Sequence, residues 1–315
     1  MMDAIIAVIS TAIVVAAVYG LVFWADRARS DRSAIVGIYL LFGLPAGLLT
    51  VAGLALTTTT DLAEGPFILA SGIALFIPLL SPVRKLIARF TPMDPASPID
   101  LCGLALILLV MAFLGVAAFQ SGPADVEASS ESLTGNFFWL VLNAATFVAL
   151  AYVSVGYRIY RTGKEATERL GLNVPSLRTV VMSVALVIPA FVISMIGSAL
   201  TVAFQPEVVD NLEQTMDQMT TGLDNPIGAL MIGLSAGIGE EVLLRGAIQP
   251  RFGIGIAALL WTMLHIQYDI SFVILSLFAI GIMFGYQRKY LGTTSAIITH
   301  ALYNVLVVAL QIVIS

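Results

Sequence analysis

The side chains of this sequence that are best suited to acid–base chemistry lie inside apolar segments of its C-terminal third. Glu240, Glu241 and Arg245 fall in the segment GLSAGIGEEVLLRG. The only two histidines of the chain, His265 and His300, fall in LLWTMLHIQYD and SAIITHALYNVL. An ionisable side chain within a bilayer is costly unless it faces a polar cavity or a partner. This set of carboxylates, imidazoles and a guanidinium therefore predicts a reaction centre inside a membrane.

The spacing of these residues indicates which side chains can pair with one another and which can face a cavity. Glu241 and Arg245 are four residues apart, share one face of a helix and can pair. Glu240 is rotated by about 100° from its neighbour, so one carboxylate can be neutralised by Arg245 while the other faces a cavity. His300 and Asn304 are also four apart and share a helix face.

These residue types suit the hydrolysis of a peptide bond. A glutamate removed from water can act as a general base on a water molecule. A neutral histidine, here His265, can share that role, orient the water or bind a metal. A second histidine, His300, together with the Asn304 amide can donate hydrogen bonds to a developing oxyanion. A metal site is the alternative, because Glu240, His265 and His300 could hold zinc with an open fourth position. The sequence has no HExxH motif, which excludes a zincin-type site.

The elements that must position these residues are membrane-spanning helices. Hydrophobic residues make up 59% of the chain and charged residues 11%, against about 25% charged in soluble domains. Backbone polar groups find no water partner in lipid, so the apolar runs should be α-helices. We therefore expect an all-α polytopic membrane protein of about ten transmembrane helices, near 4–24, 33–57, 66–83, 99–120, 136–157, 179–204, 226–249, 253–267, 270–286 and 293–314.

Charge placement predicts the orientation. Threading ten helices puts all fifteen Lys and Arg residues on one side of the membrane. The loops on the other side carry only acidic residues: Asp61, Glu64, Asp125, Glu127, Glu131, Glu207, Asp210, Glu213, Asp217, Asp224 and Asp269. By the positive-inside rule the basic side is cytoplasmic and both termini are extracytoplasmic. We expect a cell membrane, of a prokaryote, with the catalytic cavity facing the cytoplasm.

Three regions follow from this threading. Residues 1–157 form a transmembrane scaffold of five helices, residues 158–178 a basic cytoplasmic loop, and residues 179–315 the remaining five helices with the catalytic core at 226–308.

Gly233 and Gly237 have the GxxxG spacing that lets another helix approach closely. The acidic stretch 205–225 is interpreted as a solvated linker rather than a short helix. Cys102 is the only cysteine, which excludes an internal disulfide.

Three motifs carry a family resemblance. GEEVLLRG, WTMLH and HALYN, in that order, resemble the EExxxR, FxxxH and HxxxN motifs of the CAAX-processing and bacteriocin-processing (CPBP, or Abi) intramembrane proteases, which include the type II CAAX prenyl endopeptidases. The resemblance covers roughly residues 226–308. One residue departs from it, since Trp261 stands where the family usually has phenylalanine.

The resemblance also implies roles for the site residues. Glu240 would activate the water with help from His265, and His300 and Asn304 would stabilise the oxyanion. Glu241 and Arg245 would hold the site together. Trp261 lies one turn before His265 and is expected to pack there and to shape the cavity. The family is often called metalloprotease, yet the same residues can be interpreted as a metal-independent glutamate protease.

The sequence thus predicts an intramembrane endopeptidase. Its partners would be membrane lipids and a peptide or lipidated protein, such as a prenylated CAAX protein or a leader peptide; the basic loops give no reason to expect nucleic acid. Two alternatives stay open. One is a catalytically silent family member that acts as a membrane scaffold or immunity factor. The other is a proton-coupled transporter, although no internal repeat of the kind found in many transporters is present.

Overall fold

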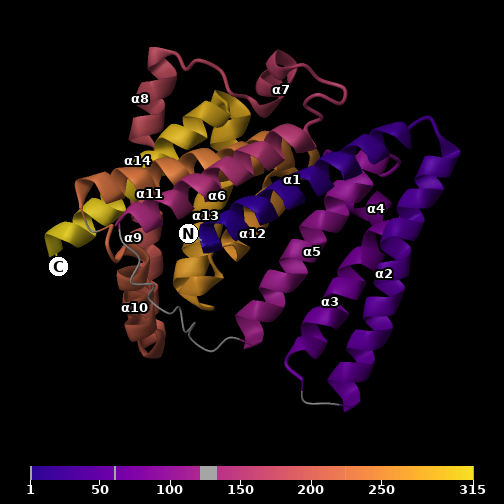
Figure 1. Ribbon diagram of the computed structural model, residues 1–315. Helices are drawn as coiled ribbons and strands as arrows, with labels where there is room; N and C mark the ends of the chain where they lie inside the picture. Colours follow the sequence, from indigo (N-terminus) through magenta and orange to yellow (C-terminus); the bar gives the residue numbers. More distant parts are fainter. Residues whose placement is uncertain (1, 60–61, 121–132, 224, 315) are drawn as a thin grey trace.

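The computed structural model describes residues 2–59, 62–120, 133–223 and 225–314, and all regular structure in these ranges is helical. The acidic residues Asp61, Asp125, Glu127, Glu131 and Asp224 lie outside the described residues. In chain order the helices are α1 (Met2–Arg27), α2 (Arg32–Thr59), α3 (Glu64–Phe76), α4 (Ser81–Ile87), α5 (Pro98–Gln120), α6 (Leu133–Ser154), α7 (Gly163–Leu170), α8 (Leu177–Ala185), α9 (Val187–Phe204), α10 (Val209–Thr220), α11 (Pro226–Glu241), α12 (Gln249–Met263), α13 (Phe272–Leu291) and α14 (Thr293–Ile314) (Figure 1). Between α11 and α12 lies η3, the π-helical segment Val242–Ile248.

The structure supports a polytopic membrane protein, with eight or nine candidate spans in the described residues where the sequence predicted about ten. Within the described ranges, eight helical segments are long and apolar enough to cross a membrane, and the bent pair α3–α4 is a ninth candidate. One of the eight runs from Pro226 to Met263. Its 38 residues would extend about 57 Å as a straight helix, well beyond a hydrocarbon core of about 30 Å. Gly253, with φ of 85°, breaks this segment into a long arm and a short arm that ends at Met263.

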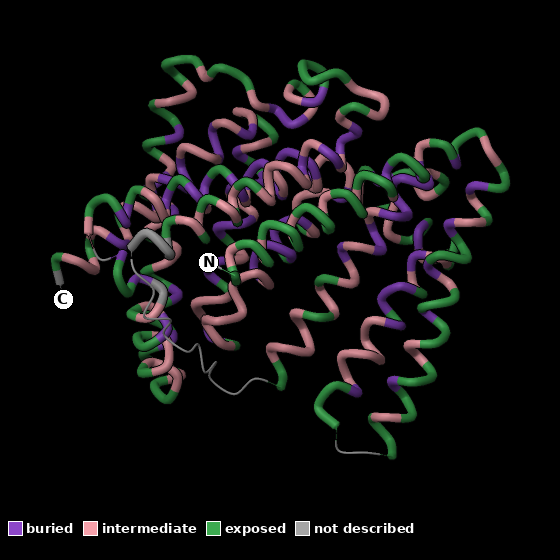
Figure 2. Tube along the Cα trace, in the orientation of Figure 1, coloured by how far each residue is buried: buried purple, intermediate pink, exposed green. Residues whose placement is uncertain are grey.

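The outer faces of the helices are apolar, as expected of a protein that sits in lipid. On α2, the side chains of Leu44, Leu48 and Val51 are exposed, Leu48 by 72%. The outer face of α1 carries exposed isoleucines in the same way. Figure 2 shows exposed positions along the outside of α1 and α2 and buried positions where the helices meet. A contiguous apolar surface of this extent marks a membrane-embedded face, so the chain is an integral membrane protein.

Contacts between helices show the direction in which each one runs. The hydroxyl groups of Thr11 and Thr146 lie 3.4 Å apart, and Tyr19 contacts Arg158, so α1 and α6 run parallel. By contrast, α11 and α14 run antiparallel, as the glycine contacts described next require. These directions are the ones that the predicted threading demands. Which end of the bundle faces the cytoplasm stays a prediction.

The close helix approach predicted from Gly233 and Gly237 is confirmed. A Cβ at Gly233 would lie 2.6 Å from the carbonyl oxygen of Ala301 and 2.6 Å from a methyl group of Val305. At Gly237 it would lie 2.9 Å from the backbone nitrogen of Ala301. No side chain fits at these distances, so only glycine lets α11 lie directly against α14. This contact places Glu241, at the end of α11, opposite His300 on α14.

Three predicted boundaries were wrong. The α-helix expected over 66–83 ends at Phe76 and continues as a 3-10 turn over Ile77–Leu79. The chain then bends by 83° into α4 at Leu80, whose backbone is extended with ψ of 105°. The helix expected over 253–267 ends at Met263, and His265 leaves it with φ of −114°. The stretch 205–225 holds the helix α10 rather than a linker. Polar contacts from Asp217 to Gln311 tie this helix to α14.

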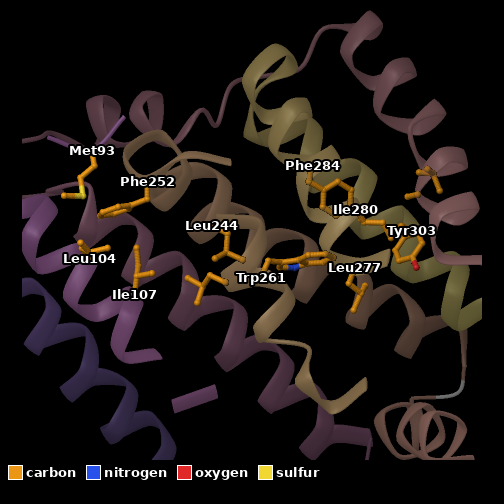
Figure 3. Close-up of a cluster of buried hydrophobic side chains, with 13 residues drawn as sticks. Met93, Leu104, Ile107, Leu244, Phe252, Trp261, Leu277, Ile280, Phe284 and Tyr303 are labelled. Carbon is orange, nitrogen blue, oxygen red and sulfur yellow. The ribbon is translucent and has the colours of Figure 1, made fainter. Parts of the chain in front are cut away.

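The largest buried cluster lies beside the predicted catalytic helices. It joins α5, α9, η3, α12, α13 and α14 through side chains that include Leu104, Leu244, Phe252, Trp261 and Phe284 (Figure 3). Trp261 is 2% exposed and is among the largest buried side chains. Trp261 therefore belongs to the apolar core of the C-terminal helices and also contacts the ionisable residues.

Candidate active site

Glu241 is the buried carboxylate of the site and joins two helices. Its side chain is fully buried, with Oε2 3.4 Å from Nε of Arg245 and Oε1 3.0 Å from Nδ1 of His300. The pairing predicted between Glu241 and Arg245 is therefore present. His300 is 2% exposed, and its contact with Glu241 links α14 to the end of α11. The carboxylate of Glu241 thus contacts both the guanidinium of Arg245 and the imidazole of His300, which come from different helical segments.

Arg245 is held in the core by charge, by aromatic rings and by one hydrogen bond. Its Nη2 donates to the carbonyl oxygen of Gly281 at 3.3 Å. The guanidinium lies 5.4 Å from the ring centroid of Trp261 and 5.8 Å from that of Phe284, within the range of cation–π attraction. A fully buried arginine needs such compensation. Arg245 is therefore integral to the packing around Trp261.

The π-helical segment η3 frees carbonyl groups that basic side chains then bind. Nε of Arg288 donates to the carbonyl oxygen of Arg245 at 3.3 Å, and Nη1 of Arg169 donates to that of Gly246 at 3.4 Å. Burial and then the charges of the neighbouring arginines, Arg251 first, lower the pKa of Arg169 to about 10. The basic segment at α7 thus contacts the turn that carries Arg245. Single-turn π-helical insertions of this kind are frequent at functional sites.

Glu240 is half-buried and points to a different neighbour from Glu241. Its Oε2 accepts a hydrogen bond of 2.6 Å from Nε1 of Trp261. Its other oxygen, Oε1, accepts no hydrogen bond from the described residues. This is the division expected from the helical rotation between the two adjacent glutamates: one is neutralised in the core, and the other keeps an oxygen for chemistry.

His265 lies just beyond the end of α12, beside Trp261. Its Nδ1 is 2.9 Å from the carbonyl oxygen of Trp261, and because a carbonyl only accepts, this nitrogen carries the hydrogen. Its ring lies 4.8 Å from that of Trp261 and stacks on Tyr268 at 6.3 Å. In neutral His265 the Nε2 atom is consequently a hydrogen-bond acceptor.

Asn304 lies on α14 one turn beyond His300 and is half-buried. Within the described part of the chain, its side chain makes no hydrogen bond. An uncommitted amide beside a histidine can still donate to a ligand. The structure thus places Asn304 on the predicted element without tying it to the other site residues.

Glu240, His265 and His300 do not converge on one point where a ligand could bind all three. Each of them contacts Trp261 instead. The indole bonds to Glu240, and the ring of His300 meets it edge-on at 5.6 Å. Among the residues that the structure describes, no group of three His, Cys, Asp or Glu side chains is placed to hold a metal ion. As these three side chains lie, they do not fit the zinc site considered as the alternative, which needs three protein ligands around one point.

Comparison with known families adds a decisive observation. Residues 223–306 match the family described as type II CAAX prenyl endopeptidase Rce1-like. This C-terminal region belongs to the CAAX protease family. All seven predicted site residues lie within the matched CAAX protease region. No curated protein and no solved structure matches the chain.

The CAAX protease region also contains contact residues that the sequence did not reveal. The ring of Phe284 stacks on that of His300 at 5.2 Å, but its position on α13 belongs to no motif. Tyr268 stacks on His265, and burial, with smaller contributions from Tyr303 and Glu240, raises its pKa to about 12. Tyr268 therefore stays a neutral phenol at physiological pH. Its position three residues after His265, just past the helix expected over 253–267, is the one signal that could have pointed to it.

Proposed function

We propose that this protein is an intramembrane endopeptidase in which Glu240 activates water to hydrolyse a peptide bond of a membrane-associated substrate. The observation that carries the proposal is the state of Glu240. One of its carboxylate oxygens is held by Trp261, and the other accepts no hydrogen bond from the described residues. This carboxylate lies among apolar helices, in a region that matches a family of endopeptidases.

The proposed reaction begins with proton transfer to Glu240. As the water oxygen bonds to the carbonyl carbon of the substrate, Oε1 of Glu240 takes the water proton. His265 orients the same water, because its Nε2 can accept the second hydrogen. The carbonyl oxygen becomes an oxyanion. When the tetrahedral intermediate collapses, the carbon–nitrogen bond breaks and the leaving nitrogen takes the proton back from Glu240.

His300 and Asn304 stabilise the oxyanion in this proposal. Nδ1–H of His300 is directed at Glu241 at 3.0 Å, so in the protonated imidazole Nε2–H is the donor that remains. The carboxylate of Glu241 lies between this imidazole and the guanidinium of Arg245. The amide of Asn304 supplies a second donor. Donors that are fixed before the reaction are the main source of such stabilisation.

The substrate proposed is a lipidated CAAX protein or a leader peptide that reaches the site from the membrane. We place the cavity toward the cytoplasm of a prokaryotic cell membrane, with residues 158–178 on that side. Residues 1–157 would form a scaffold that borders the substrate. The basic segment 158–178 suits contact with anionic lipid headgroups.

The proposed orientation has a direct test. Single cysteines placed in 158–178 of a Cys102→Ser chain should react with a membrane-impermeant thiol reagent only after the cytoplasmic face is opened. Cysteines placed near Glu207 should react in intact cells. Labelling of 158–178 from outside would reverse the orientation.

The proposed activity is tested with purified protein and candidate peptides, prenylated and unprenylated. We expect cleavage that persists in a strong chelator, because Asn304 beside His300 suits an oxyanion donor better than a zinc shell. The protein should contain less than one metal ion per chain. Stoichiometric metal, together with activity lost on chelation and restored by zinc, would contradict the metal-independent mechanism but not the endopeptidase.

A further inference from the structure

We infer that Trp261 is a positioning residue for Glu240, and that its indole N–H fixes which carboxylate oxygen acts on water. The inference rests on the proposed function and assigns this residue more than packing. At this position the resemblance described above expects phenylalanine, which has no N–H to donate.

The contact is a directed one. An indole nitrogen can only donate, and the acceptor 2.6 Å away is Oε2 of Glu240. Hydrogen bonds to a carboxylate are shorter and stronger than those between neutral groups. Trp261 is 2% exposed, so water has little access to compete for its N–H.

The ring is held in one orientation from several sides. The guanidinium of Arg245 lies over it at 5.4 Å, and Phe284 meets it edge-on at 5.8 Å. On α13, a Cβ at Gly281 would lie 3.1 Å from the ring atom Cε3. Rotation of the indole would displace these neighbours. The N–H group is therefore directed at Glu240 before any substrate binds.

The consequence for Glu240 is a restriction of its freedom. A half-buried glutamate on a helix otherwise samples several rotamers, and ordering a long side chain costs entropy. The hydrogen bond from the indole restricts the Glu240 side chain to one orientation already in the folded protein. It occupies Oε2, so Oε1 is the oxygen that can act on water. Trp261 thus acts on the reaction through the carboxylate rather than by touching the substrate.

The backbone of the same residue holds the other water-binding group, which makes the experiment selective. The carbonyl oxygen of Trp261 binds Nδ1 of His265, and Trp261→Phe leaves this carbonyl in place. The substitution also keeps an aromatic ring beside Arg245 and the histidines. What it removes is the donor to Glu240.

The first measurement is steady-state cleavage by Trp261→Phe. We expect kcat to fall roughly 10- to 100-fold, in line with the loss of a hydrogen bond to a charged group, while KM stays unchanged. Trp139→Phe, at an exposed position on α6, is the matched control and should retain the kcat of the parent. In a Glu240→Gln background, Trp261→Phe should reduce the residual rate by much less than in the parent. Parental kcat in Trp261→Phe, or an equal loss in both backgrounds, would overturn the inference.

A second measurement needs no activity. Trp24→Phe with Trp139→Phe leaves Trp261 as the sole tryptophan. Glu240→Ala removes its acceptor and should shift its fluorescence emission, whereas Glu168→Ala, at an exposed position on α7, should not. An emission unchanged by Glu240→Ala would overturn the contact even where Trp261→Phe fails to fold. If the parent cleaves no peptide and the emission still shifts, the proposed function fails and the Trp261–Glu240 contact stands.

Discussion

Replacing Glu240 with glutamine should slow peptide cleavage by about 10²- to 10⁴-fold, the usual worth of general-base assistance. Glutamine keeps the shape of the side chain and an oxygen that can accept from Trp261, but it cannot take the proton of water. Folding and substrate binding should therefore persist. Initial rates of cleavage, thermal unfolding and peptide affinity of the purified variant measure these three properties separately.

The matched control for this change is Glu168→Gln, which removes a carboxylate from an exposed site on α7. It should cleave at the rate of the parent. Full activity of Glu240→Gln would contradict the proposed mechanism and leave a membrane scaffold or a proton-coupled transporter as the better hypotheses. A total loss of folded protein would instead assign Glu240 a structural role.

Replacing Arg245 with alanine should lower the free energy of unfolding by about 3–5 kcal/mol, because it leaves Glu241 buried without its cation. The same change removes the guanidinium from the rings of Trp261 and Phe284. Thermal or denaturant unfolding in detergent, together with folded yield, measures the loss. Activity should fall with stability. A variant that is inactive but as stable as the parent would assign Arg245 a direct role in catalysis.

Two further variants sharpen this prediction. Arg27→Ala breaks another pair with i, i+4 spacing, Arg27–Asp31, whose arginine side chain is 67% exposed, and pairs exposed to water contribute little. It should unfold close to the parent. Adding Glu241→Gln to Arg245→Ala removes the uncompensated charge and should recover part of the lost stability. No recovery would indicate that the ring contacts of Arg245, rather than its charge, stabilise the fold.

Local spacing predicted the parts of the site that depend on one helix. The pairing of Glu241 with Arg245 follows from i, i+4 geometry, and the different surroundings of the two glutamates follow from their rotation about the helix axis. The close packing of α11 on another helix followed from Gly233 and Gly237. Each of these features follows from residue spacing within one helix, although the spacing of the two glycines does not say which helix packs against α11.

Contacts between helices could not be predicted in the same way. The sequence placed His300 near the catalytic carboxylate, whereas the structure has it on Glu241. That choice depends on the register of α14 against α11, which motif spacing does not specify. Trp261 was expected to pack and to shape the cavity. Its role as a hydrogen-bond donor could be inferred only from the structure, which places its indole N–H beside Glu240. The end of α12 at Met263 was missed because apolar residues continue beyond it.

The break at Gly253 sets an order in which the site can be assembled. Glu240 and Trp261 are 21 residues apart in sequence, a separation of about 31 Å along an uninterrupted helix, and they touch because the chain folds back between them. Glu241 and His300 are 59 residues apart. Contacts of short sequence separation form first, and synthesis presents the N-terminal partner earlier. A nascent chain that has reached the end of α12 therefore already contains both partners of the Glu240–Trp261 contact. The imidazole of His300 arrives only with α14, so the contact between Glu241 and His300 forms after the preceding helices have been made.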